Sequence, residues 1–145
     1  MKKLFTKICI ASDHAGYDLK EEIKDYLIKK SISVIDLGPF SKDSVDYPDY
    51  AKKVAKRIIL RKSDAGILVC GSGTGMAITA NKFKGIRAAQ CYNKVSTILS
   101  RQHNNSNVIC LGSRLLKYKE AFKYVTYFLN TKFKSGRHQK RVNKI

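Results

Sequence analysis

Short apolar runs alternate along the chain with longer segments in which apolar residues recur at helical spacing. In residues 17–30, Leu19, Ile23 and Leu27 fall three or four positions apart, which predicts a helix with one buried face. Residues 65–70 form a nearly continuous apolar run, typical of a parallel strand covered on both faces. The two patterns predict strands over residues 7–12, 32–37, 65–70, 85–91 and 108–112, and helices over residues 17–30, 47–60, 76–83, 94–103 and 117–129.

Each predicted strand is followed by a predicted helix. This order favours an α/β fold, a three-layer Rossmann-like sandwich with a five-stranded parallel sheet, built as a single domain over residues 1–145. Residues 131–145 are basic and contain few apolar side chains. We interpret them either as a solvated terminus or as an arm that packs on a partner subunit.

Parallel sheets of this kind bind ligands beyond the carboxyl ends of their strands. Polar clusters follow four of the predicted strands, at residues 12–14, 70–75, 92–93 and 113–114. The cluster at 70–75 contains Gly71, Gly73 and Gly75 and opens a predicted helix, a combination that favours an anion. The GxGxG spacing and the absence of a GK[ST] sequence argue against a dinucleotide site and a P-loop. A tight turn without a ligand is the alternative.

Composition adds a strong positive charge. The 145 residues include 29 Lys and Arg against 11 Asp and Glu, a formal net charge of +18, and Glu120 is the one acidic residue after position 64. Such a balance favours anionic partners, namely phosphorylated metabolites, nucleic acid or a membrane surface. No apolar run approaches the roughly 18 residues of a membrane span. Because Lys7 interrupts the apolar start and Asp13 follows soon after, we reject a signal peptide and expect a cytoplasmic protein without a membrane partner.

Four cysteines lie in predicted strands and form no CxxC pair, so we expect reduced thiols and no disulfide framework. Cys70 ends a strand directly before the glycine-rich segment. The free N–H groups at the start of a helix favour a thiolate, so Cys70 is a candidate base or nucleophile. The alternative for Cys70, and our interpretation of Cys9, Cys91 and Cys110, is a small core residue.

The histidines and arginines complete the candidate chemistry. His14, His103 and His138 fit no local metal-binding spacing. The chain has 22 Lys but only 7 Arg, and Arg has the planar fork that suits phosphate oxygens. Arg114 follows the last predicted strand. Arg137 and Arg141 would share one face if the tail is helical; otherwise they belong to a solvated basic tail.

Several motifs together resemble one enzyme family. They are Ser-Asp-His-Ala-Gly at 12–16, Val-Asp-Tyr-Pro-Asp at 45–49, Cys-Gly-Ser-Gly-Thr-Gly at 70–75, Ala-Asn-Lys-Phe at 80–83 with Gly-Ile-Arg-Ala at 85–88, His-Asn at 103–104, Cys-Leu-Gly-Ser-Arg at 110–114, and Gly-Arg-His-Gln at 136–139 with Arg141. Over residues 8–145 the chain resembles the type B ribose-5-phosphate isomerases, whose family also holds the galactose-6-phosphate isomerase subunits.

The resemblance implies a homodimer without metal or organic cofactor that interconverts ribose 5-phosphate and ribulose 5-phosphate in the pentose phosphate pathway. Pairing of two such dimers is left open. By resemblance, Cys70 is the base that moves a proton between C1 and C2, and Ser72 assists at the substrate oxygens. The segment 71–75 forms an anion hole for the enediolate. His103 opens the furanose ring, with Asp13 nearby.

The resemblance also implies a set of binding residues, with the tail arginines supplied by the partner chain. Those expected to bind substrate are His14, Tyr47, Gly71, Gly73, Thr74, Gly75 and Asn104, with His14 near the phosphate. Those expected to bind the phosphate are Arg114, Arg137 and Arg141.

Four other functions stay open at this point. A six-carbon sugar phosphate, such as allose or galactose 6-phosphate, would need more room around the sugar. A cysteine hydrolase would need a histidine within hydrogen-bond reach of Cys70. A nucleic-acid binder would use the basic second half, but leaves the glycine loop without a role. A non-catalytic subunit would not need Cys70 and His103 together with the arginines.

Overall fold

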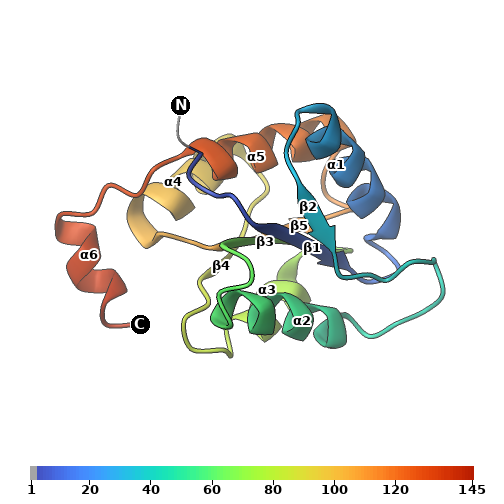
Figure 1. The fold of residues 1–145 in the computed structure, drawn as a ribbon, viewed down its shortest axis with the longest axis horizontal. Helices are drawn as coiled ribbons and strands as arrows, with labels where there is room; N and C mark the ends of the chain where they lie inside the picture. The colour runs from blue at the N-terminus through green and yellow to red at the C-terminus, as the bar shows by residue number, and fades with distance from the viewer. Residues whose placement is uncertain (1–2) are drawn as a thin grey trace.

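A computed structural model describes residues 3–145 and shows one parallel sheet between two helical layers (Figure 1). The strands are β1 (Ile8–Ser12), β2 (Val34–Asp36), β3 (Ala65–Cys70), β4 (Ala88–Gln90) and β5 (Val108–Gly112). They pair in the order β2-β1-β3-β5-β4, and every pair is parallel. The predicted α/β fold with a five-stranded parallel sheet is confirmed.

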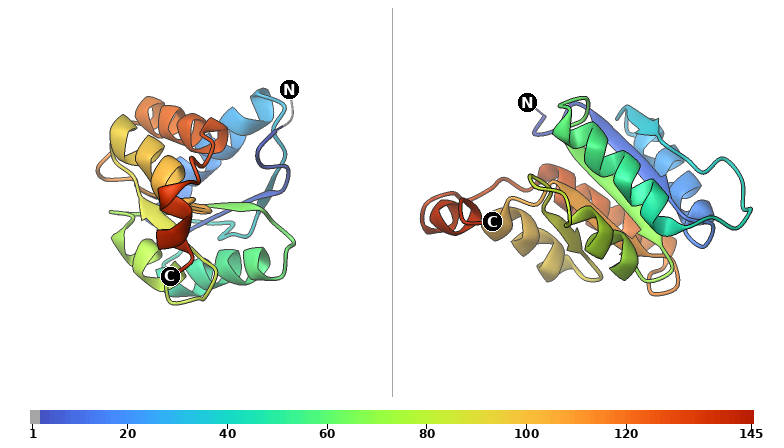
Figure 2. Two further views of the ribbon diagram at one scale, coloured as in Figure 1. Left: turned by 90° about the vertical axis from the view of Figure 1, so that its left-hand side faces the viewer. Right: turned by 90° about the horizontal axis from the view of Figure 1, so that it is seen from below.

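The helices are α1 (Tyr17–Lys29), α2 (Tyr47–Ile59), α3 (Thr74–Ala80), α4 (Lys94–Asn104), α5 (Tyr118–Asn130) and α6 (Arg137–Val142). Helices α1, α4 and α5 cover one face of the sheet, and α2 and α3 cover the other (Figures 1 and 2). Side chains alternate between the two cores, so that Ile8 and Ile10 of β1 face α1 while Cys9 and Ala11 face α2.

Two predicted elements are shorter than expected and one was missed. The edge strands β2 and β4 pair on one side only and contain three residues each, where the sequence predicted longer strands. The tail from residue 131, for which the sequence predicted no definite element, contains helix α6. Figures 1 and 2 show α6 projecting from the end of the molecule at which α4 terminates.

The direction of the chain separates two groups of residues. Every strand ends at the carboxyl edge of the sheet, where Asp13 follows β1 and Cys70 ends β3. Helix α4 leaves that edge after β4 and returns to the amino edge, where β5 begins. His103, in the last turn of α4, is therefore separated from Cys70 by the length of a strand, on the order of 15–20 Å for five or six residues.

One ion cluster is buried between α1 and β2. The Lys20 ammonium is fully buried and donates to Asp36 Oδ2 over 2.7 Å, and Lys24 donates to the same oxygen over 2.8 Å. Burial alone would raise the pKa of Asp36, but the hydrogen bonds from the two lysines outweigh it and the pKa is lowered. Asp36 Oδ1 also accepts from Gly38 N–H over 2.8 Å, which fixes the turn after β2.

No helix among residues 3–145 is long and apolar enough to span a membrane.

We expect Asp36→Asn to lower the free energy of unfolding by about 3 kcal/mol, because a buried Lys20 loses the closer of its two carboxylate partners and keeps only Glu21. Asp18→Asn, in the exposed pair with Lys42, should cost less than about 1 kcal/mol. Urea denaturation measures both. Because the folded pKa of Asp36 is lowered, its contribution is present above about pH 4 and is lost as the pH falls through the folded pKa. Equal losses of unfolding free energy in Asp36→Asn and Asp18→Asn would contradict the role of Asp36 as the partner of a buried charge.

Candidate active site

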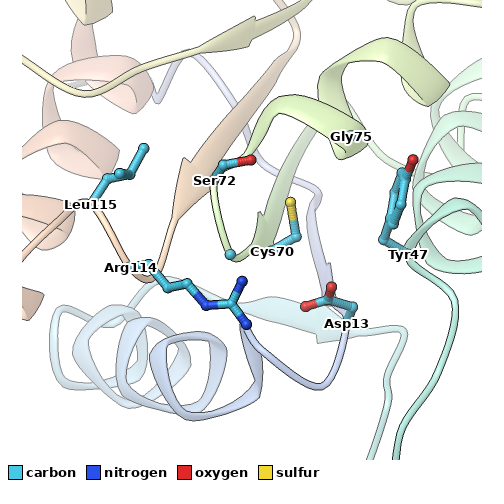
Figure 3. Close-up of a pocket in the computed structure, with 8 residues that line it drawn as sticks. Asp13, Tyr47, Cys70, Ser72, Gly75, Arg114 and Leu115 are labelled. Atoms are coloured by element: carbon cyan, nitrogen blue, oxygen red, sulfur yellow. The ribbon is translucent and has the colours of Figure 1, made fainter.

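The first candidate site is a cavity of about 420 Å³ at the carboxyl edge of the sheet. It brings together residues from four separate segments of the chain (Figure 3). Its lining residues are Asp13, Tyr47, Cys70, Gly71, Ser72, Gly75, Arg114 and Leu115. Seven of these eight residues were candidates from the sequence; Leu115, which is exposed beside the cavity, was not.

The glycine-rich segment is shaped around the Cys70 sulfur. Gly73 has a φ of 79°, in the left-handed region that favours glycine, and its N–H donates to Cys70 Sγ over 3.1 Å. A Cβ on Gly75 would lie 2.4 Å from the Tyr47 ring, so glycine is needed where this ring packs on the start of α3. The turn therefore holds the sulfur in a fixed orientation and leaves one side of it open to the cavity.

Gln90 was missed by the sequence analysis, although it braces this segment. Its side-chain amide donates to Ser72 O over 2.7 Å and to Thr74 Oγ1 over 2.8 Å. Gln90 ends the edge strand β4, far from the loop in sequence, so only the strand order β5-β4 brings the two together. The sequence around a single glutamine in a short strand does not indicate which distant segment its side chain contacts.

Asp13 and Arg114 approach the cavity from the ends of β1 and β5. Asp13 is buried, and its Oδ1 accepts from Gly16 N–H over 2.9 Å. Figure 3 shows the Arg114 side chain extending toward Asp13 past the Cys70 thiol. His14 is exposed, and its Nδ1 lies 3.2 Å from both the N and O of Val45, so it borders the segment that leads to Tyr47 without lining the cavity.

The other three cysteines are sealed in the core, as the sequence predicted. Cys9, Cys91 and Cys110 are at most 1% exposed, and burial raises the pKa of each thiol. All four cysteines are free thiols. Cys70 is the one whose sulfur meets a cavity, so the chemistry of the thiols is concentrated at this position.

A second cavity, of about 470 Å³, lies at the end of α4 and beneath α6. Its candidate residues are His103, Asn104, Arg137 and Arg141, joined by His138, Val142 and Ile145. Helix α6 places Arg137 and Arg141 one turn apart on the same side, which confirms the shared face expected for a helical tail.

His138 is a further residue that the sequence analysis did not assign. Its ring stacks on His103 with 4.2 Å between centroids and 12° between planes. Burial lowers the pKa of His138, and the neighbouring charges of His103, Arg137, Arg141 and Lys134 lower it further. The stacked His138 ring therefore supports the His103 ring in a cavity that Arg137 and Arg141 also line.

The structure does not unite the two cavities within one chain. Within one chain, His103 and Asp13 line different cavities, because α4 runs from the carboxyl edge to the amino edge and carries His103 away. Arg114 likewise lines the Cys70 cavity, apart from Arg137 and Arg141. No histidine lines the Cys70 cavity, so the arrangement does not support the cysteine hydrolase.

Helix α4 carries an exposed apolar surface, which we call the α4 face. It comprises Val95 and Leu99 on the helix and Tyr92 just before it, each at least 38% exposed. Val95, Leu99 and His103 recur every fourth residue, so the apolar stripe and the His103 ring lie along one side of α4. Exposed apolar clusters of this kind mark surfaces that another protein covers.

Among residues 3–145, no group of three or more His, Cys, Asp or Glu side chains could hold a metal ion.

Comparison with known proteins gives one consistent family. Residues 8–145 match the family model described as Ribose/Galactose Isomerase. A ribose-5-phosphate isomerase B of Escherichia coli is 45% identical over 139 residues, covering 96% of this chain and 93% of that protein. The crystal structure of a ribose 5-phosphate isomerase from Thermotoga maritima superposes with a TM-score of 0.94 at 51% identity, covering 96% of each chain. The Mycoplasma genitalium ribose-5-phosphate isomerase B, solved with bound ribulose-5-phosphate, gives 0.92 at 45% identity, covering 95% of this chain and 92% of that one.

We expect one thiol of the native protein to react rapidly with a small aromatic disulfide reagent, because Cys70 alone lines a cavity while burial keeps the other thiols neutral. Cys70→Ala should remove the rapid phase, and Cys9→Ala should leave it unchanged. Absorbance of the released thiolate measures the rate. A rapid phase that survives in Cys70→Ala would show that another thiol is accessible.

Proposed function

Because the chain belongs to the ribose/galactose isomerase family, we propose that it is a ribose-5-phosphate isomerase that interconverts D-ribose 5-phosphate and D-ribulose 5-phosphate in the pentose phosphate pathway. The observation that carries the proposal is the Cys70 sulfur, which faces a cavity that Asp13 and Arg114 also line and is held by Gly73 N–H. The similarity to a relative solved with ribulose-5-phosphate supports the five-carbon substrate.

Isomerisation moves one proton between neighbouring carbons. The Cys70 thiolate removes the proton from C2 of the open-chain aldose, and the electron pair forms the C1–C2 double bond of an enediolate. A hydroxyl proton moves from O2 to O1, and return of the abstracted proton to C1 leaves the carbonyl at C2 and regenerates the thiolate. The hydrogen bond from Gly73 N–H holds the Cys70 sulfur in place. The position of the base is therefore fixed by the backbone of the glycine-rich segment.

The negative charge that develops on the substrate oxygens needs fixed donors. The backbone of the segment 71–75 lies against the cavity, and Gln90 braces it from β4. The Ser72 hydroxyl is exposed at the rim, where it can exchange protons with the oxygens on C1 and C2. Asp13 and Tyr47 line the same cavity, and His14 borders the segment that leads to Tyr47; we assign all three to orient the sugar.

The remaining functions require a second copy of the chain. Ring opening needs an acid–base group at the furanose oxygen, and the phosphate needs cationic donors. We assign ring opening to the partner subunit's His103, and phosphate binding to the partner subunit's Arg137 and the partner subunit's Arg141, with Asn104 contacting the sugar beside them. Arg114 extends into the cavity from the first chain and completes the positive end of the site.

The α4 face supports a homodimer that joins the two cavities. Covering Val95 and Leu99 with a second copy also covers the neighbouring His103 ring. A twofold interface presents the same surface from both chains, so each chain would complete its partner's site, with residues 131–145 acting as the arm. The four free thiols and a sugar-phosphate substrate support a cytoplasmic location.

We expect Cys70→Ala to reduce turnover of ribose 5-phosphate by about 10²–10⁴-fold, because proton abstraction loses its base. A coupled assay for ribulose 5-phosphate, without added metal, measures the rate, and Cys9→Ala serves as the control for loss of a buried thiol. Full turnover in Cys70→Ala would remove Cys70 as the base. An inactive wild-type dimer would overturn the five-carbon assignment, and allose and galactose 6-phosphate would then be assayed.

A mixture of inactive variants tests whether the site is shared. Cys70→Ala and His103→Ala chains, unfolded together and refolded, should recover about one quarter of wild-type activity, since half of the random dimers are mixed and each contains one intact site. Cys70→Ala mixed with Ser72→Ala should recover nothing, because both lesions fall in the same half of the site. Failure of the first mixture, with dimers present by light scattering, would place the whole site in one chain.

A further inference from the structure

Arg101 is a buried cation that the proposed mechanism does not use. It lies on α4 and is 5% exposed, and within the described range 3–145 no carboxylate lies within 4 Å of its guanidinium. Burial lowers the pKa of Arg101, and the nearby charge of Arg87 lowers it further, so the surroundings disfavour the charge. A buried guanidinium without an ion-pair partner is costly, and packing alone would be served by an apolar side chain.

The guanidinium joins two segments through oxygen acceptors. Its Nη1 donates to Ser106 O over 2.5 Å and to Asn105 Oδ1 over 3.0 Å, in the turn that ends α4. Its Nε donates to Thr131 O over 3.1 Å, at the start of the C-terminal arm. One planar group therefore ties the end of α4 to the first residue after α5.

Two aromatic rings fix the plane of this group. The guanidinium carbon lies 4.8 Å from the centroid of Phe5 and 5.7 Å from that of Phe128, and the two rings are stacked on each other. A backbone hydrogen bond extends the tie, since Lys134 N–H donates to Gln102 O over 3.0 Å. After it, only residues 135–136 precede Arg137.

The two segments that Arg101 joins carry the residues of the second cavity. His103 and Asn104 lie two and three residues after Arg101 on α4, and Arg137 and Arg141 follow Thr131 on the arm. We propose that Arg101 is a positioning residue that sets the distance between the ring-opening His103 and the phosphate-binding pair Arg137 and Arg141. This inference rests on the proposed function, and it assigns to Arg101 no contact with substrate.

Lysine cannot replace this arrangement. Its ammonium is a point donor without a rigid plane, so it can neither present a flat cation to the Phe5 and Phe128 rings nor span the fixed oxygens of Asn105, Ser106 and Thr131. Loss of the guanidinium would let the arm shift relative to α4. The predicted consequence is weaker binding of the phosphate, while the Cys70 cavity at the opposite edge of the sheet keeps its geometry.

Arg101→Lys and Arg101→Met test the inference, with Arg57→Met as the matched control. Arg57 is also a partly buried arginine with one side-chain hydrogen bond, to Ser63 Oγ over 3.0 Å, but it lies on α2 away from both cavities. We expect both Arg101 variants to raise the KM for ribose 5-phosphate by about 10-fold or more, because small misplacements of binding groups are costly. The KM of Arg57→Met should stay within about twofold of the wild-type value, because the Arg57 side chain is distant and lines neither cavity.

Two further readouts separate positioning from general loss of structure. The rate of thiol modification at Cys70 should be unchanged in Arg101→Lys, which shows that the opposite half of the molecule is intact. In Arg101→Ala, millimolar guanidinium chloride should restore the KM and an equal concentration of sodium chloride should not. If Arg101→Met fails to fold, Arg101→Lys decides: a wild-type KM in that variant overturns the inference.

An additional measurement keeps this inference distinct from the proposed function. Titration with inorganic phosphate, followed by the NMR resonances of the stacked His103 and His138 rings, requires no turnover. If the wild type is inactive toward ribose 5-phosphate, the proposed function fails. The positioning role is then judged by the phosphate titration, in which Arg101→Lys should need about 10-fold more phosphate for the same shift. An unchanged titration in Arg101→Lys overturns the role.

Discussion

The direction of the chain in a parallel sheet is the constraint on which the rest of this structure depends. Strands end at one edge and the helices between them end at the other, so groups that follow strands and groups that end helices are kept a strand length apart. Cys70 belongs to the first set and His103 to the second. Aldose–ketose isomerisation of a cyclic sugar phosphate needs both kinds of group at one substrate, and a second copy of the chain is the simplest way to bring them together. The separation of the two cavities is thus a consequence of the topology, and it is the reason why we propose a site shared between two chains.

The same topology decides which thiol is available for chemistry. All four cysteines lie in or beside strands, and three are sealed under helices where burial keeps them neutral. Cys70 differs because β3 ends there and the chain turns sharply through Gly71 and Gly73. That turn removes the covering helix from one side of the sulfur and supplies a backbone N–H on another. A residue type that is common in cores thus meets a cavity here because of its place at the end of the strand.

Periodicity and order were sufficient to predict the five strands, the five helices between and after them, and the cluster around Cys70, because each depends on residues close in sequence. The pattern could not predict contacts that depend on strand order, such as the hold of Gln90 on Ser72 across the β5–β4 edge. It also missed α6, which is short, basic and poor in apolar residues, so it lacks the stripe that marks a helix. The separation of His103 from Asp13 within one chain could not be predicted, because motif resemblance carries roles and does not say which chain supplies each residue.

The scarcity of arginine gains a physical meaning once its positions are known. Arg57, Arg87 and Arg101 each donate to fixed oxygens at the ends of elements, to Ser63 Oγ, Asn105 O and Ser106 O respectively. Arg114, Arg137 and Arg141 instead line cavities, and the ion pairs seen within residues 3–145 are all made by lysine. The planar fork is therefore used where geometry matters, either to lock a turn or to meet an anion, and lysine supplies the remaining positive charge. Arg87 and Arg101 both hold the turn after α4, which leads into the second cavity beside Arg137 and Arg141. The placement of this helix end therefore sets the geometry of the site at which we propose that phosphate binds.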